Sequence, residues 1–91
     1  MLELHLPQAR SLKDKRRVVK SLVERLHQRH RVSVAETDHH DLHQRAEISI
    51  ALVAQAESEA ERLLADLRRT ADGKVEALVT RWEPQILEGM A

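Results

Sequence analysis

The stretch TDHHDLHQ, residues 37–44, gathers three histidines and two aspartates, residue types that could bind a metal ion or move a proton. His39 and His43 are four residues apart, so they would share one face if the stretch formed a helical turn. A zinc site would need three or four such ligands, each held rigidly by a supporting partner. The available ligands would be His39, His40 and His43, together with Asp38 or Asp41.

The same stretch can also be read as a turn between two strands. Aspartate is frequent in turns because its side chain bonds to nearby backbone groups. On this interpretation the loop is structural, and we expect Asp38 and Arg45 to form an ion pair across it. The sequence favours a structural loop over a metal site or proton chemistry, and we predict neither catalytic residues nor a cofactor.

A second group of residues, in a predicted helix, could bind phosphate. At about 100° per residue, several cations fall opposite Val19 and Leu26, on the outer face of the helix. Arg10 lies in the preceding loop, close to helix N–H groups that attract anions. A solvated helix face is the alternative interpretation. The predicted phosphate-binding residues are Arg10, Lys13, Arg16, Arg17, Lys20 and Arg31.

The charges of the chain are unevenly distributed, although the net charge is zero. Residues 10–31 hold nine lysines and arginines against two acidic residues, a balance of +7. Residues 32–91 hold six against twelve, a balance of −6. Such segregation either attracts an anionic partner to one face or draws the two halves together.

Two residues of the basic helix are predicted to be structural. Lys15 falls within the apolar stripe, where its stem can cover the core while the ammonium reaches Glu36 or Asp38. His30 ends the helix, where the helix dipole favours a cation.

Hydrophobic periodicity predicts the elements that position these residues. Apolar and polar residues alternate over 2–6, from Val32 and over 46–53, as in half-buried strands, and 74–82 forms a fourth strand. Capping boxes at Ser11 and Ser58 begin two helices. The first helix runs to His30, and the second ends at Gly73 in a left-handed conformation. Residues 86–91 form a fraying tail.

This element order predicts one domain, residues 1–91, with a ferredoxin-like βαββαβ fold of the α+β class. Both helices would cover one face of a four-stranded antiparallel sheet. Strand parity leaves small or acidic residues and no lysine or arginine on the other face, and does not assign Trp82. The open-face residues would be Glu3, His5, Ser33, Ala35, Glu47, Ser49, Ala51 and Val53. Such a face is either solvated or packs against a second copy, so a homodimer is expected on the second interpretation.

The composition excludes several classes of protein. Without cysteine, the chain has no disulfide and no thiolate metal site. Trp82 is the only aromatic residue, which argues against base stacking on the sheet. The loop PQAR lacks the glycines of a phosphate cradle. No apolar run approaches the ~18 residues of a membrane span and no signal peptide is evident, so we expect a soluble, cytoplasmic protein.

The segments LHLPQARSLKDKRRVVKSL and VSVAETDHHDLHQRAEISIALV resemble the bacterial YlxP-like family, a family of unknown function. The resemblance covers residues 2 to about 83 and implies a small ferredoxin-like domain. Members are often encoded near genes for translation initiation and ribosome maturation, which implies RNA or the ribosome as a partner. Gln8 departs from a common glycine and His43 from a common aromatic residue. We therefore expect a non-enzymatic, RNA- or ribosome-associated protein, with a self-associating interaction module as the alternative.

Overall fold

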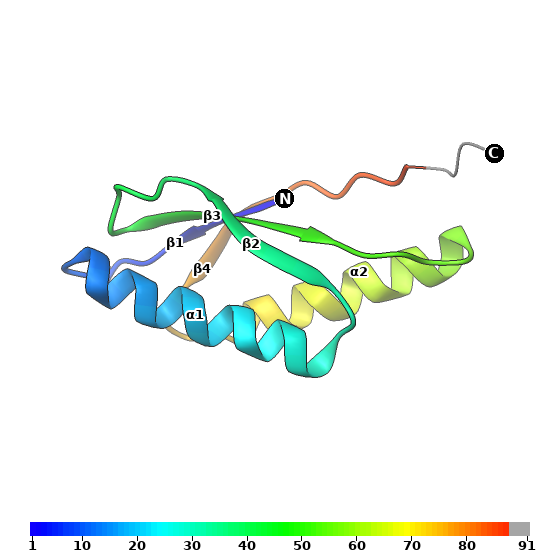
Figure 1. The fold of residues 1–91 in the computed structure, drawn as a ribbon, viewed down its shortest axis with the longest axis horizontal. Helices are drawn as coiled ribbons and strands as arrows, with labels where there is room; N and C mark the ends of the chain where they lie inside the picture. Colours follow the sequence, from blue (N-terminus) through cyan, green and yellow to red (C-terminus); the bar gives the residue numbers. More distant parts are fainter. Residues whose placement is uncertain (88–91) are drawn as a thin grey trace.

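A computed structural model describes residues 1–87 and confirms the predicted ferredoxin-like βαββαβ order. The four strands form one antiparallel sheet in the order β2-β3-β1-β4, and both helices lie on one side of it (Figure 1). The elements are β1 Leu2–His5, α1 Leu12–Arg29, β2 Ser33–Asp38, β3 Arg45–Ala51, α2 Glu57–Asp72 and β4 Leu78–Trp82. No helix in residues 1–87 is both long and apolar enough to cross a bilayer.

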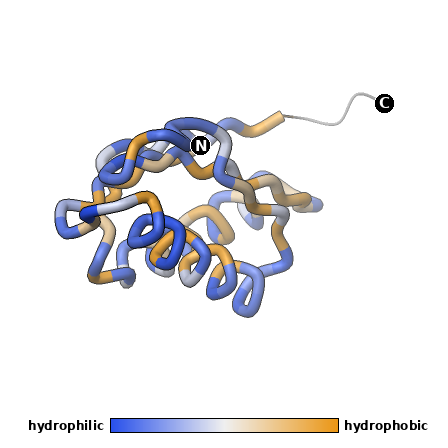
Figure 2. The backbone as a smooth tube through the Cα atoms, turned by 60° about the vertical axis from the view of Figure 1, so that its left-hand side comes forward, coloured by the Kyte–Doolittle hydropathy of each residue, from blue (hydrophilic) through white to orange (hydrophobic). Residues whose placement is uncertain are grey.

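The core forms where alternate strand residues meet the apolar stripe of α1. Hydrophobic and hydrophilic stretches alternate along both layers of the chain (Figure 2). Because successive strand residues point to opposite faces, every second residue of β1 is directed at the helices. The fully enclosed residues of the core include Leu2, Leu4, Leu6, Leu22, Leu26, Ala46, Ile48 and Leu67.

The two helix starts differ in how they are capped. Ser11 caps α1 as predicted, because its side chain accepts a hydrogen bond from the Asp14 N–H at 3.1 Å. The predicted cap at Ser58 is wrong: α2 begins two residues earlier, with Ala56 at the N-cap position and no side-chain cap. Glu59 explains the earlier start, since its carboxylate accepts the Gln55 N–H at 3.2 Å.

The ends of the helices also test the prediction. Gly73 ends α2, but with φ −72° it is right-handed, so the predicted left-handed conformation is wrong. The last turn closes through a hydrogen bond from the Gly73 N–H to the Arg69 carbonyl. His30 caps the end of α1, and its Nε2 lies 2.9 Å from Thr70 Oγ1 of α2, which confirms a structural role.

β4 is shorter than predicted, because a turn at Lys74–Ala77 precedes it. A register shift against β1 leaves Thr80 unpaired. This bulge places both Val79 and Trp82 opposite the helix-facing leucines of β1, which assigns Trp82 to the helix side of the sheet. Residues 88–91 of the predicted fraying tail lie outside the described residues.

The open face of the sheet carries arginines, so the predicted absence of arginine and lysine there is wrong. Arg45 lies opposite His5, and Arg81 lies opposite Glu3. Strand pairing places these side chains on the same face as the predicted small residues. A bulge in β2 adds Thr37, whose hydroxyl is 2.8 Å from Ser49 Oγ on that face.

Candidate nucleic-acid interface

The cations of α1 project outward from the fold. The valines and leucines of the inner stripe are buried against the sheet, which directs the charged side chains to solvent. Lys13 and Lys20 are separated by about 10 Å along the helix, at ~1.5 Å per residue. The structure therefore brings together five of the predicted residues, which we call the basic face: Arg10, Lys13, Arg16, Arg17 and Lys20, all exposed.

The sixth predicted residue, Arg31, is not part of the basic face. It is exposed but follows the far end of α1, which spans 18 residues or roughly 27 Å. Arg29 is an exposed cation near the same end that the sequence prediction omitted. Arg29 lies on the same side of α1 as Leu22, but it follows Leu26, the last buried residue of the helix, and is therefore exposed. Arg29 is one of the nine cations behind the charge of +7 over residues 10–31, and this charge could have drawn attention to it in the sequence.

Acidic residues from the second half of the chain neutralise the basic face at one position. Arg17 pairs with Glu76, with 3.1 Å between Nη2 and Oε2. The Arg17 hydrogen bond is the main cause of the lowered pKa of Glu76, and Lys74 adds to it. Within residues 1–87, the other four cations of the basic face form no ion pair. Most of the positive charge is therefore available to a ligand.

The N-terminus of α1 is less open to anions than predicted. Ser11 accepts the Asp14 N–H, and the Asp14 carboxylate accepts the Arg10 N–H at 3.0 Å. Asp14 thus places a negative charge where a phosphate would otherwise meet the helix terminus. Any phosphate contact must rely on the arginine and lysine side chains.

Lys15 is the buried cation of α1, with 1% of its side chain exposed. Its Nζ lies 2.9 Å from Glu36 Oε2, which confirms the expected partner. It also donates to the carbonyl of His39 at 2.7 Å and to that of Arg45 at 3.3 Å. The geometry between Nζ and Oε2 is not that of a hydrogen bond, so the buried oxygen is compensated by the nearby charge alone.

The β2–β3 loop, residues 39–44, holds the histidines of the predicted metal alternative. His39 Nε2 lies 3.0 Å from Glu3 Oε1, whereas His40 Nε2 lies 3.2 Å from the Glu36 carbonyl. His43 is exposed. These side chains reach separate partners, and no three acidic or histidine residues converge as metal ligands within the described chain.

The predicted Asp38–Arg45 ion pair is wrong. Asp38 Oδ1 instead accepts the N–H of the next residue, His39, at 2.7 Å. Arg45 pairs with Glu3 across the sheet, with 3.3 Å between Nη2 and Oε1. Hydrogen bonds from His39 and then Arg45 lower the pKa of Glu3, against the opposing effect of burial. The pairing of β1 with β3 decides this outcome, because it sets Glu3 beside Arg45.

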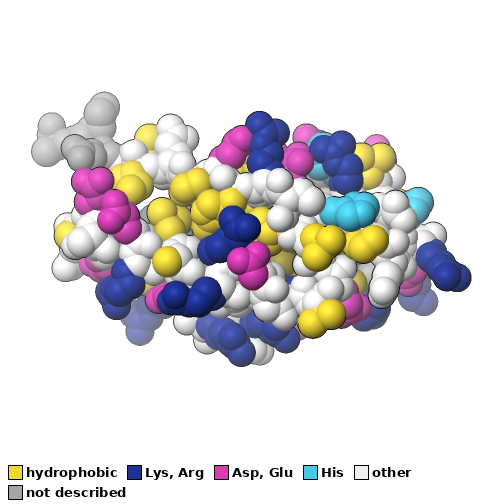
Figure 3. All heavy atoms as spheres, turned by 180° about the vertical axis from the view of Figure 1, so that it is seen from behind, with side chains coloured by type: hydrophobic (Ala, Val, Ile, Leu, Met, Phe, Trp, Pro, Cys, Tyr) yellow, Lys and Arg dark blue, Asp and Glu magenta, His cyan; other side chains and the backbone are white. Residues whose placement is uncertain are grey.

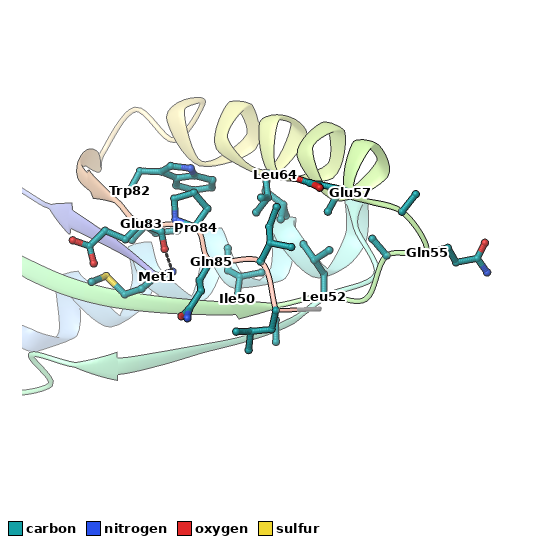
Figure 4. A pocket seen from close by; sticks show the side chains of 18 residues that line it. Met1, Ile50, Leu52, Gln55, Glu57, Leu64, Trp82, Glu83, Pro84 and Gln85 are labelled. Atoms are coloured by element: carbon teal, nitrogen blue, oxygen red, sulfur yellow. Dashed lines mark hydrogen bonds between the residues drawn. The ribbon is translucent and has the colours of Figure 1, made fainter. Parts of the chain in front are cut away.

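A cavity of about 880 Å³ lies at the other end of the sheet, between α2, the end of β3 and the segment after β4. Figure 4 shows Leu64, Trp82 and Pro84 along it, with Ile50 and Leu52 on the strand side. Two side-chain carboxylates, Glu57 and Glu83, line it from separate segments. Such a lining suits apolar contact and offers no paired acid and base for catalysis.

A comparison with curated proteins finds no match. A family model described as "Protein of unknown function (DUF503)" matches residues 1–83. Because this match covers nearly the whole ferredoxin-like domain, the chain belongs to the DUF503 family.

Proposed function

We propose that the protein is a non-enzymatic RNA-binding protein of the YlxP-like kind, which contacts the phosphate backbone through the basic face of α1. Ribosomal RNA is the expected source of the ligand. The proposal rests on one observation: four exposed cations without an ion pair in the described chain, Arg10, Lys13, Arg16 and Lys20, share one helix and its preceding loop.

The chemistry of these residues suits a polyanion. Arginine and lysine contacts with phosphate displace condensed counterions, so affinity depends steeply on salt and little on base sequence. Each phosphate contact contributes ~0.7 to 0.9 to the slope of log K against log salt. Four contacts predict an affinity loss of about two orders of magnitude between ~50 and ~200 mM salt.

The test compares two variants with the same change in net charge. One replaces two cations of the basic face, Arg16→Gln with Lys20→Gln. The control replaces two exposed arginines of α2, Arg62→Gln with Arg69→Gln. Affinity for a labelled RNA hairpin is measured by fluorescence anisotropy over a salt series.

The α1 variant should bind more weakly than wild type, and its salt slope should fall by roughly 1.4 to 1.8. The α2 variant should retain the wild-type slope, because its substitutions lie outside the basic face. Equal losses in both variants, or wild-type binding that does not change with salt, would contradict the proposal.

A further inference from the structure

The β2–β3 loop is held rigidly although it is exposed. The Lys15 ammonium donates to the His39 carbonyl at 2.7 Å and to the Arg45 carbonyl at 3.3 Å, at the two ends of the loop. Inside the loop, the Leu42 N–H bonds to the His39 carbonyl at 3.0 Å. His39 has φ 64°, a left-handed conformation that costs free energy for a residue with a side chain and persists because these contacts enforce it.

The rigid loop exposes an apolar side chain and imidazole rings to solvent. Leu42 is 44% exposed, and His40 and His43 of the same loop are exposed as well. Because so much of its surface is exposed, Leu42 contributes little buried apolar area to the core of the protein. Two imidazoles and one apolar side chain are thus exposed within residues 40–43, together with the carboxylate of Asp41.

This surface adjoins the basic face. The Gln44 side chain donates to the carbonyls of Pro7 and Ala9, both at 3.3 Å, and the Leu6 N–H bonds to the Gln44 carbonyl. These bonds join the loop to the segment that carries Arg10 and leads into α1. The loop and the start of α1 lie at the same end of the molecule (Figure 1). Seen from behind, the surface of the molecule carries histidine, hydrophobic and basic side chains toward this end (Figure 3).

We propose that His40, Leu42 and His43 contact unpaired bases of the RNA whose phosphates the basic face binds. This inference rests on the proposed function and specifies its ligand: a stem with an adjacent single-stranded loop or bulge. Unpaired bases stack on histidine rings as they do on other aromatic side chains, and apolar side chains pack against them.

The remaining surfaces make this loop the best platform for bases. Trp82 is the only aromatic residue of the chain, and it faces the helices, with the Arg68 guanidinium carbon 5.4 Å from its ring centre. The open sheet face therefore presents no Trp, Tyr or Phe ring, and its histidine, His5, is only partly exposed, so this face suits sheet-based RNA binding poorly. The imidazoles of His40 and His43 are exposed, and their loop is hydrogen-bonded to the segment that leads into α1.

The experiment uses two RNA hairpins with the same stem and the same number of phosphates. One has ordinary bases in its loop, and the other has abasic nucleotides there. Wild-type protein should bind the first about tenfold more tightly, the effect of stacking one base. The loop variant His40→Ser with Leu42→Ser and His43→Ser should bind both hairpins alike, while its salt slope stays at the wild-type value.

Two controls separate this inference from the proposed function. His27→Ser removes an exposed histidine of α1 outside the loop and should keep the base preference. The variant Arg16→Gln with Lys20→Gln should weaken binding of both hairpins and keep the ratio between them. His40→Ser alone should lower the ratio between the two hairpins without removing it, and urea unfolding of each variant verifies that it is folded.

The outcomes are distinct. Equal wild-type affinity for the two hairpins overturns the base contact and leaves the phosphate contact standing. A preference that survives in the loop variant also overturns it, as does a loop variant with a reduced salt slope, which would make the loop a phosphate contact. Absence of binding to both hairpins overturns this inference and the proposed function together. If the loop binds a protein instead of RNA bases, the loop variant should keep the wild-type ratio between the two hairpins.

Discussion

Lys15 joins three parts of the molecule through one buried ammonium group. Its stem lies in the core beside the apolar residues of α1, and its Nζ reaches β2 and both ends of the β2–β3 loop. Removing one member of a buried ion pair leaves the other charge without compensation, whereas replacing both members by apolar groups is close to neutral.

We therefore expect Lys15→Met to lower the free energy of unfolding by about 3 kcal/mol. The double variant Lys15→Met with Glu36→Leu should recover most of this loss, although the loop carbonyls lose their donor. Urea unfolding measures both effects. Lys13→Met, on the exposed face, is the matched control and should change stability by less than ~0.5 kcal/mol. A double variant no more stable than Lys15→Met would contradict the ion-pair explanation.

Glu3 predicts a pH dependence. Hydrogen bonds from His39 and Arg45 lower its pKa below the ordinary value of 4.5. A carboxyl group whose pKa is depressed in the folded state stabilises the fold above its unfolded pKa. That stabilisation disappears as the pH falls through the folded pKa. The unfolding midpoint should therefore drop below about pH 4.5, where Glu3 begins to protonate in the unfolded chain.

The change Glu3→Gln should reduce this slope without removing it, because the pKa of Glu76 is also lowered and acts in the same direction. Thermal unfolding between about pH 3 and 6 tests the prediction. Glu24→Gln, at an exposed position of α1, serves as the control. Identical pH profiles for wild type and Glu3→Gln would show that Glu3 contributes no linkage.

At the scale of the elements, α2 begins without a side-chain cap, and its stability can be raised there. A serine at an N-cap position is typically worth ~1 kcal/mol more than alanine. We expect Ala56→Ser to stabilise the protein by about this amount and Ser11→Ala, at the start of α1, to destabilise it similarly. Ser58→Ala should have little effect, because Ser58 lies inside α2. Urea unfolding of the three variants tests the assignment, and a loss at Ser58 as large as that at Ser11 would refute it.

Element type and core composition could be predicted because they depend on local periodicity. The leucines of β1 and the apolar stripe of α1 repeat at strand and helix spacing, and Lys15 stood out as a cation within that stripe. These features need only the identity of nearby residues in the chain. The pairing of Lys15 with a carboxylate, Glu36 or Asp38, followed from them, and the structure selects Glu36.

The prediction failed where a distant partner or a register decides the result. The pairing of β1 with β3 places Arg45 beside Glu3, so Arg45 forms its ion pair with Glu3 and not with Asp38. The β4 bulge at Thr80 decides which way Trp82 points, and strand alternation alone cannot locate a bulge. For the candidate site, helix periodicity located the basic face. The approach of Gln44 to the loop before α1, however, is a tertiary contact without a local signal.

At the scale of the whole molecule, the acidic part of the chain leaves most cations of the basic face without an ion pair within residues 1–87. Among the described residues, two ion pairs from α1 join the basic and acidic parts of the chain: the buried Lys15 with Glu36, and Arg17 with Glu76. The remaining cations of the basic face stay in solvent on a molecule whose net charge is zero. A polyanion can thus recognise one face of a protein that carries no overall charge.

The sheet face opposite the helices bears on the alternative proposal, self-association. On this face, Ser33 and Ala35 of β2 lie opposite Ala51 and Ser49 of β3. These side chains are small, so a second sheet could approach closely. Arginines and glutamates elsewhere on the face supply charges of both signs for a two-fold related copy. Four strands spaced by ~4.8 Å, each with about six residues at ~3.3 Å, present roughly 400 Å² of projected area. The face is small, so we expect a weak homodimer.

Sedimentation equilibrium over a range of protein concentrations tests this proposal. Wild type should shift from monomer to dimer as the concentration rises. Ala51→Lys should remain monomeric, because an ammonium on the open face would lose its hydration on pairing. Ala65→Lys places the same substitution at an exposed position of α2 and should dimerise like wild type. A wild-type protein that stays monomeric at the highest concentration would refute packing through this face, and equal weakening by both substitutions would trace the association to net charge.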